Sequence, residues 1–321
     1  MATLKETKVR INSVKGTLKI TSAMKLVASA KLISAEKSVR ALLPYRDTLS
    51  SMLRDLQSAA PAAMSSGGGD AAKAHAEPST PYSGSAGAFD AAATGAVAII
   101  AVASNSSLCG GFNANAVKAA LECAKAQSGD VTVFSIGKKM ADTMRRCGYP
   151  SPKDLNQMSS KPKYEDASVL ASEFMSDCAR GRFSRVYLIY NHFVTTSRQE
   201  VLTEIFLGPD VSTASLPPRG AEQGDYAPRN VNAASYNWPS EYIIEPSPSE
   251  AIDRLLPLTL KVRLFAALLD SNAAEHAARL VAMQTATDNG EELLHEITLE
   301  YNKARQQKIT SEILDLASSG M

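Results

Sequence analysis

The feature that most restricts the fold of this chain is an apolar seam near its N-terminus, with the alternating three- and four-residue spacing of a coiled coil. In residues 4–56 this spacing meets an apolar side chain at twelve of sixteen positions. The sixteen positions are Leu4, Thr7, Ile11, Val14, Leu18, Thr21, Lys25, Ala28, Leu32, Ala35, Val39, Leu42, Arg46, Leu49, Leu53 and Leu56. A seam of this length is typical of one long helix that packs against another helix. At ~1.5 Å per residue, the predicted helix is about 80 Å long.

A second seam with the same spacing occupies the C-terminal part of the chain, and twelve of its sixteen positions are again apolar. These positions are Ile252, Leu255, Thr259, Val262, Ala266, Leu269, Ala273, His276, Leu280, Met283, Thr287, Gly290, Leu294, Ile297, Tyr301 and Ala304. Beyond the last of them the apolar positions shift by one residue, to Ile309, Ile313 and Leu316. We therefore predict a helix over about 249–317 whose last turns present apolar side chains to something other than the first helix. Pro257 predicts a kink near its start.

The two ends of the chain carry opposite net charges. Residues 1–56 hold eleven Lys or Arg and four Asp or Glu residues, a net charge of +7, whereas residues 249–321 hold seven basic and eleven acidic residues, a net charge of −4. Because the whole chain has a formal charge of only +1, composition gives no general argument for nucleic-acid binding. Residues 1–56 also contain one aromatic residue, Tyr45, whereas nucleic-acid sites usually interleave aromatics with basic residues. We expect the two helices to pair antiparallel, since a compact domain between them brings the chain back close to the point where it left the first helix.

The middle of the chain changes to a pattern of strands alternating with helices. The apolar, β-rich runs span 96–103, 131–136 and 185–190, and the helical stretches span 113–127, 138–147 and 164–180. This alternation predicts a parallel, Rossmann-like sheet. Polar and apolar residues alternate over 200–207, which indicates an added edge or hairpin strand.

The expected fold class is therefore α/β with a long coiled coil: an antiparallel coiled coil of the N- and C-terminal helices plus a central Rossmann-like α/β domain. The expected segments are an N-terminal coiled-coil helix at 1–58, a low-complexity insertion at 59–93, the α/β domain at 94–248 and a C-terminal coiled-coil helix at 249–321. The insertion is dense in Ala, Gly, Ser and Pro, which favours an exposed spacer. A second Pro-, Asn- and Ser-rich stretch, 216–240, joins the α/β domain to the last helix.

One loop, residues 104–113, lies where a doubly wound fold places its ligand site, after a strand and before a helix. The chain has neither GxGxxG nor GxxxxGK[ST], so no glycine-rich phosphate cradle is indicated. Two interpretations remain open, a structural loop in which Asn113 or Asn115 caps the helix and a ligand site at the helix N-terminus. Cys109 is favoured as a small buried residue over a nucleophile, because no histidine is identifiable as its base.

No cofactor, metal site or catalytic group is predicted from the remaining residues. The four cysteines, Cys109, Cys123, Cys147 and Cys178, and the four histidines, His75, His192, His276 and His295, form no motif with the spacing of metal ligands or catalytic pairs. Scattered cysteines favour a reducing compartment. The longest apolar run falls short of the ~18 residues of a membrane span, and the N-terminus lacks the apolar core of a secretory signal. We therefore expect a soluble, cytosolic chain.

Four segments carry a resemblance to a known family. Residues 13–32 read SVKGTLKITSAMKLVASAKL and resemble the N-terminal signature of the gamma subunit of F-type ATP synthases. Residues 275–289 (EHAARLVAMQTATDN) and 299–313 (LEYNKARQQKITSEI) are similar to its C-terminal signature. Residues 108–113 (LCGGFN) match its central motif. The matches at both ends and in the middle cover all of the chain except the insertions.

The resemblance implies a rotor. It implies that the two terminal helices pass up the axis of a catalytic hexamer of alpha and beta subunits, and that the α/β domain is a foot on a membrane ring of c subunits beside the epsilon subunit. It also implies a non-catalytic subunit that couples proton-driven rotation to ATP synthesis or hydrolysis. It further implies that membrane association is indirect. The lack of a transit peptide favours a peripheral protein on the cytoplasmic face of the bacterial plasma (inner) membrane.

The resemblance also assigns partner contacts. Met24 and Lys25 correspond to the contact with the beta subunit's C-terminal lever region, and Thr310 and Glu312 to the upper bearing. The other assigned contacts with the hexamer are Arg279, Met283, Arg305 and Gln306. Lys25 interrupts an otherwise apolar seam, so a lysine that extends its charged end to solvent from a coiled coil is the alternative interpretation.

The chain departs from the family in two places. Asn105, Ser106 and Ser107 stand where the family usually has Asp-Arg-Gly, so the role of those charges is not carried over. The 59–93 insertion has no cysteine, so the dithiol switching of photosynthetic relatives is not expected. An alternative function is a Rossmann-like ligand-binding or enzymatic domain on a coiled-coil dimerisation stalk, with the 104–113 loop as its pocket.

Overall fold

The computed structural model describes residues 4–64, 95–127, 129–208, 245 and 247–319. In chain order its elements are α1 (Leu4–Met64), β1 (Ala96–Val102), α2 (Phe112–Ala126), β2 (Val131–Ile136), α3 (Lys138–Arg146), α4 (Asn156–Ser160), α5 (Tyr164–Ala179), β3 (Phe183–Phe193), β4 (Gln199–Leu207) and α6 (Pro248–Ser319). Every predicted helix and strand is present, and only the short helix α4 was not predicted. The first helix continues past residue 58 into the expected insertion. The rest of that insertion and the 216–240 stretch lie outside the described residues.

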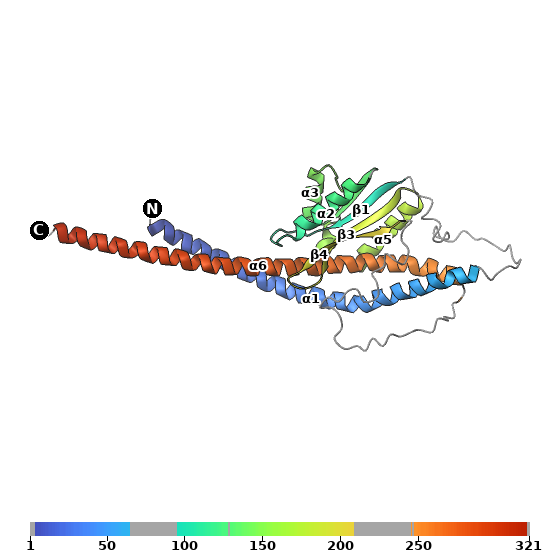
Figure 1. The fold of residues 1–321 in the computed structure, drawn as a ribbon, viewed down its shortest axis with the longest axis horizontal. Coiled ribbons are helices and arrows are strands. Elements are labelled where there is room, and N and C mark those ends of the chain that lie inside the picture. The colour runs from blue at the N-terminus through green and yellow to red at the C-terminus, as the bar shows by residue number, and fades with distance from the viewer. Residues whose placement is uncertain (1–3, 65–94, 128, 209–244, 246, 320–321) are drawn as a thin grey trace.

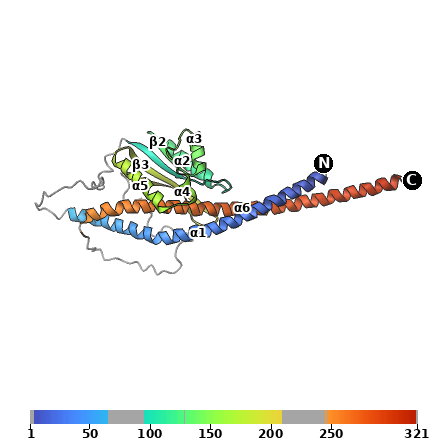
Figure 2. The same ribbon diagram turned by 180° about the vertical axis from the view of Figure 1, so that it is seen from behind.

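The molecule is a long rod of two helices with an α/β domain on one side (Figure 1). Helices α1 and α6 lie side by side and run in opposite directions, so that both ends of the chain lie at the same end of the rod (Figure 2). The Thr287 hydroxyl donates a hydrogen bond of 3.2 Å to the Thr21 hydroxyl. A Cβ on Gly290 would lie 2.7 Å from Leu18 Cδ2. The predicted antiparallel direction is therefore confirmed.

The helix register explains the change of phase in the second seam. With Thr21 opposite Thr287 and Leu18 opposite Gly290, the same antiparallel register places Leu4, the first described residue of α1, opposite Ala304. Beyond this residue α6 extends past the start of α1 (Figure 1). The apolar pattern in the sequence therefore shifts where the described part of the partner helix ends.

Burial follows the predicted seams. All sixteen positions of each seam are buried or half-buried. Off the seam, apolar residues such as Val9 and Ile20 on α1 are more than 60% exposed. Helix α6 passes through Pro257 without a break, and the kink expected there stays a prediction. Each buried leucine of the seam contributes about 1.5–3 kcal/mol, so the seam holds the two helices together along the rod.

The α/β domain contains one four-stranded sheet with the order β2-β1-β3-β4. Strand β1 pairs in parallel with β2 and β3, while β3 and β4 form an antiparallel hairpin. Strand β1, which has a neighbour on each side, is apolar throughout, as expected of a strand covered on both faces. The predicted parallel sheet with an added hairpin strand is confirmed as a mixed sheet.

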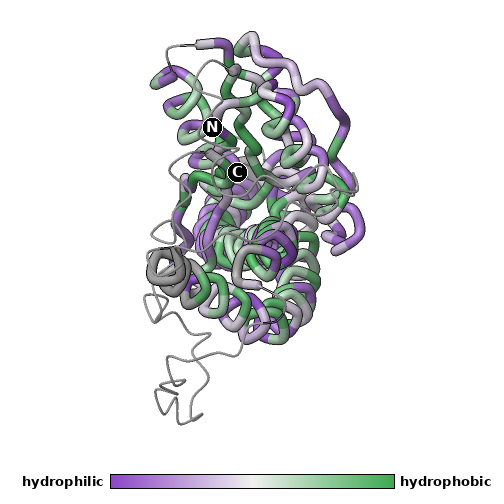
Figure 3. The backbone as a smooth tube through the Cα atoms, turned by 90° about the vertical axis from the view of Figure 1, so that its right-hand side faces the viewer, coloured by the Kyte–Doolittle hydropathy of each residue, from purple (hydrophilic) through white to green (hydrophobic). Residues whose placement is uncertain are grey.

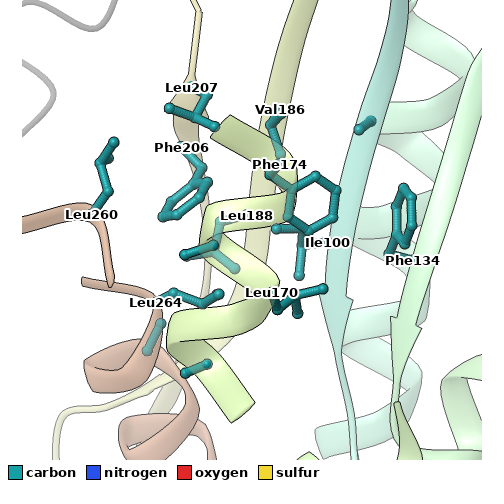
Figure 4. Packing of buried hydrophobic residues seen from close by; sticks show 14 of the residues in the cluster. Ile100, Phe134, Leu170, Phe174, Val186, Leu188, Phe206, Leu207, Leu260 and Leu264 are labelled. Atoms are coloured by element: carbon teal, nitrogen blue, oxygen red, sulfur yellow. The ribbon is translucent and has the colours of Figure 1, made fainter. Parts of the chain in front are cut away.

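Helices cover both faces of this sheet. On one face, Phe174 of α5 and Leu264 of α6 pack with Leu188 of β3 and Phe206 of β4 (Figure 4). On the other face, alanines of α2 and the buried methionines of α3 pack on β1. A third cluster joins α1 and α6 to the domain, through residues such as Leu32, Ala273 and Phe112. Figure 3 looks along the rod and shows the helix pair end-on below the domain. Helix α6 therefore belongs both to the rod and to the core of the domain.

The turn between β2 and α3 makes a first prediction. Gly137 adopts φ +104°, and a Cβ there would lie 2.1 Å from the Ala103 carbonyl oxygen. We expect Gly137→Ala to destabilise the sheet by about 2–4 kcal/mol, because it combines a strained φ with a backbone clash. Hydrogen exchange of the β1 and β2 amides measures this loss. Gly129→Ala is the matched control, since nothing lies within 4 Å of its Cβ position. Equal protection of the two variants would contradict the prediction.

Candidate functional site

The 104–113 loop follows β1 and folds on itself. The Ser104 amide donates to Asn113 Oδ1 at 3.0 Å, and the Ser104 hydroxyl donates to the same oxygen at 2.9 Å. The Asn113 amide group donates to Cys109 Sγ at 3.1 Å. The N-cap residue of α2 is Gly111, and no side chain caps the helix. The capping role expected for Asn113 or Asn115 is therefore wrong, because the Asn113 side chain forms its hydrogen bonds within the loop.

Two residues of the loop show how tightly it is held. Cys109 is 1% exposed, which confirms the expected buried position. Leu108 adopts φ +68°, a left-handed conformation that is uncommon for a side chain of this size. The polar side chains of the loop bond both within the loop and to neighbouring elements. The exposed surface of the loop includes the Leu108 side chain, which is 56% exposed.

The loop meets α6 at a polar cluster in which the α6 residues are buried and Ser106 of the loop is exposed. Arg279 is 9% exposed, and its Nη2 donates to the Ser106 hydroxyl oxygen at 2.6 Å. Its Nη1 donates to Glu275 Oε1 at 2.8 Å, one turn earlier on α6. His276 Nδ1 lies 3.4 Å from the same Nη1. Ser106, one of the residues that departs from the family pattern, thus binds the guanidinium of a predicted contact residue.

Burial shifts the ionisation of this cluster. Removal from water, together with the positive charges of Arg279 and Lys31, lowers the pKa of His276 from 6.5 to about 4. Burial also raises the pKa of Glu275, although Arg279 and Lys31 oppose that shift. His276 is therefore neutral at pH 7, and the Glu275 carboxyl group and the Arg279 guanidinium are in contact.

Sequence reasoning missed a second polar contact between the sheet and α6. His192 Nδ1, at the end of β3, lies 2.5 Å from Asp270 Oδ2, and the Phe193 amide donates to Asp270 Oδ1 at 3.0 Å. The pair is 78 residues apart in sequence, so no motif spacing marks it. Apolar residues and Arg46 complete a cavity of about 20 Å³ beside it. This volume holds about one water molecule.

The predicted partner contacts lie in three different environments. Arg305, Gln306, Thr310 and Glu312 are exposed on the part of α6 that extends past α1, whereas Met24 and Lys25 are half-buried on the rod. The other two contacts, Arg279 and Met283, are buried at 9% and 5% exposure. In the structure Arg279 contacts Ser106 of the 104–113 loop. Contacts of all eight residues with partner subunits stay predictions.

The residues that the structure describes offer no group of three or more His, Cys, Asp or Glu side chains arranged to hold a metal. His75 lies outside them. None of the described helices is long and apolar enough to cross a bilayer. A rod of two helices that carries an α/β domain on one side defines a stalk-like protein.

Comparison with known proteins identifies the family. The family model described as ATP synthase matches residues 3–320. The chain is 40% identical to the ATP synthase gamma chain of Bacteroides thetaiotaomicron and 38% identical to that of Bacteroides fragilis, in both cases over the whole of each chain. It is 35% identical to the gamma chain of Geotalea daltonii, over 99% of this chain and 98% of that one. This chain belongs to the family of ATP synthase gamma chains.

Solved structures agree at the level of the fold. The rotor of the Euglena gracilis mitochondrial ATP synthase matches with a TM-score of 0.59 and 17% identity, over 95% of this chain and 98% of that one. The central stalk and c-ring structure of the Tetrahymena thermophila enzyme matches with a TM-score of 0.51 and 19% identity, over 83% and 99%. The helical rod and the α/β domain are therefore a fold already seen in these assemblies.

The buried His276 predicts a pH dependence. Its pKa is lowered to about 4 in the folded chain, so below pH 6.5 the unfolded chain binds a proton that the folded chain does not. The stability present above pH 6.5 is then lost as the pH falls towards 4. Between pH 7 and pH 5 this loss amounts to about 2 kcal/mol. Urea unfolding of the wild type and of His276→Gln at both pH values measures it.

The comparison concerns the pH dependence rather than absolute stability, because the substitution itself changes packing. We expect the wild type to lose about 2 kcal/mol more than His276→Gln between pH 7 and pH 5. His295→Gln, at an exposed position on α6, is the control and should keep the wild-type pH dependence. A His276→Gln variant with the same pH dependence as the wild type would contradict a neutral, buried His276.

Proposed function

We propose that this chain is the rotary central-stalk subunit of an F-type ATP synthase, which couples proton-driven rotation of a membrane c ring to ATP synthesis or hydrolysis in an alpha–beta hexamer. One observation carries the proposal: full-length identity of 37–40% to several ATP synthase gamma chains. The rod-shaped fold supports it, because a shaft needs length and stiffness rather than a substrate pocket.

The proposed mechanism is mechanical coupling by a non-catalytic subunit. The helix pair forms an antiparallel coiled coil, and its two sides differ in charge, with a basic α1 and an acidic α6. Such a shaft presents a different surface to each of several identical catalytic sites around it. Each rotation step then changes the relative nucleotide affinities of those sites, which is a coupling free energy between interface and site. No side chain of this chain contacts the nucleotide in this mechanism.

The exposed surface of the rod is the proposed contact with the hexamer. Met24 and Lys25 contact the lever region of the beta subunit. The tip of α6 contacts the upper bearing through Arg305, Gln306, Thr310 and Glu312. Ile309 and Ile313, 47% and 60% exposed on the same tip, supply apolar surface, which is favoured at the centre of protein interfaces. Arg279 and Met283 support this surface from inside the chain.

The α/β domain is the proposed foot. It lies at the opposite part of the rod from the α6 tip (Figure 1), so a tip inside the hexamer leaves the domain free to contact the c ring and the epsilon subunit. The chain is then a peripheral protein on the cytoplasmic face of the bacterial plasma membrane. Its attachment to the membrane runs through these partners.

The alternative, a ligand-binding or enzymatic α/β domain on a dimerisation stalk, is not favoured. Its pocket was expected at the 104–113 loop, but the Ser104 and Asn113 side chains bond to the loop itself, and Ser106 binds Arg279. The apolar seam of α1 packs on α6 of the same chain. It is therefore not available as a dimerisation surface for a second copy of the chain.

The tip of α6 gives the test of this proposal. We expect the triple variant Ile309→Ser, Ile313→Ser and Leu314→Ser to lower ATP hydrolysis by the reconstituted alpha–beta complex roughly tenfold, a loss of ~1.4 kcal/mol in coupling to the hexamer. These side chains are exposed in the chain, so the isolated variant keeps its fold. Mg-ATP hydrolysis by alpha and beta subunits mixed with each chain is the measurement.

Val169→Ser is the matched control, because Val169 is an equally exposed apolar residue, at 61%, on α5 of the α/β domain. It should leave hydrolysis at the wild-type level. Deletion of residues 303–321 measures the whole contribution of the tip. A wild-type chain that neither assembles with alpha and beta subunits nor changes their activity, and that binds ATP alone, would overturn the proposed function.

A further inference from the structure

Helix α6 carries polar side chains that reach across to the α/β domain, apart from its apolar contacts. Arg263 Nη2 donates to Glu204 Oε2 on β4 at 2.6 Å. Asp270 accepts the Phe193 amide at 3.0 Å, and its other oxygen lies 2.5 Å from His192 Nδ1. These contacts tie one side of α6 to the hairpin of β3 and β4.

Two more side chains bind residues near the carboxyl end of β1. Asn272 Nδ2 donates to the Ser159 carbonyl oxygen on α4 at 3.0 Å. Arg279 Nη2 donates to the Ser106 hydroxyl at 2.6 Å. The Ser159 hydroxyl in turn donates to the Ala103 carbonyl oxygen at 2.6 Å, so both contacts lead to the end of β1.

The four α6 residues occupy opposite flanks of the helix. At ~100° per residue, positions seven apart share a side, so Arg263 and Asp270 lie on one flank and Asn272 and Arg279 on the other. Asp270 and Arg279 are nine positions apart, which is about half a turn. Between the flanks, an apolar strip that includes Leu264 packs into the domain core (Figure 4). We call the four residues the polar key.

An apolar strip and a two-sided set of hydrogen bonds resist different motions. Burial of apolar area is non-directional, so it resists separation of helix and domain much more than rolling of the helix about its axis. Hydrogen bonds weaken steeply away from their preferred distance and angle. A roll of α6 in either direction stretches bonds on one flank or the other. The polar key therefore fixes the roll angle of α6 relative to the sheet.

We propose that the polar key is the torsional link between the α/β domain and the shaft, so that torque passes between them through α6. This inference rests on the proposed rotary function and adds the residues that transmit rotation within the chain. Arg263, Asp270, Asn272 and Arg279 act as positioning residues, and none of them contacts nucleotide in this role.

The test compares two variants that remove hydrogen bonds of similar kind. Ser106→Ala with Asn272→Ala removes both domain contacts of one flank and leaves the bond of Arg279 to Glu275 in place. The control is Ser184→Ala, which removes a half-buried bond of 2.9 Å to the Gly95 carbonyl oxygen within the α/β domain. Ser106→Thr keeps a hydroxyl at the key and serves as the conservative variant.

The measurement uses the chain assembled with alpha and beta subunits immobilised on a surface. A bead is attached to Cys147, which is exposed on the α/β domain. Cys123→Ser removes the half-buried cysteine that could also react, and Cys109 and Cys178 are buried. The angular variance of the bead while the complex waits for ATP reports the torsional stiffness between the domain and the held shaft. If the five bonds of the polar key contribute equally and additively, loss of the two bonds of one flank raises the variance to about 1.7 times the wild-type value.

We expect this rise for Ser106→Ala with Asn272→Ala, and wild-type variance for Ser184→Ala and Ser106→Thr. Equal variance for the flank variant and Ser184→Ala would overturn the polar key. If the flank variant does not assemble, Ser106→Ala alone is measured against the same two variants and decides by the same criterion. Failure of the wild-type chain to assemble or rotate would instead contradict the proposed function, so the two failures are distinguishable.

Discussion

The packing of α1 against α6 along one antiparallel apolar seam is the interaction on which the rest of the structure depends. Most of the stability of a helix comes from packing of its apolar face rather than from propensity, and each of these helices buries its seam on the other. Because Thr21 lies opposite Thr287, the register also decides where pairing ends. It leaves the last turns of α6 as a single helix with an exposed apolar surface.

Helix α6 serves two purposes, and its surroundings change along its length. Near Leu264 and Ala274 it is enclosed by α1 and the α/β domain and is almost fully buried. The buried Glu275 and Arg279 hold each other in contact, as buried charges require. Nearer the C-terminus only its seam is covered. One continuous helix thus connects the domain core to the exposed tip, so a rotation of the part of α6 in the domain core reaches the tip along the same helix.

Periodic features of the fold could be predicted from the sequence, and non-periodic ones could not. The seams and strands are repeated local patterns, so they identified the helix pair and the sheet. The contacts of His192 with Asp270 and of Ser106 with Arg279 join residues far apart in the sequence, and no sequence pattern predicts them. Asn113 was expected to cap α2, but its side chain accepts hydrogen bonds from Ser104 of the loop instead. The partner contacts came from family resemblance, and of the eight residues only the four at the tip of α6 are exposed in the structure.

The measurement that tests the central claim most directly is single-molecule rotation. The alpha–beta complex is fixed to a surface, the chain is assembled with it, and a label on Cys147 of the α/β domain is followed in Mg-ATP. The account predicts that the label turns in one direction while ATP is hydrolysed and stops when ATP is withdrawn. A complex that contains the chain and hydrolyses ATP at full rate while the label stays still would contradict it.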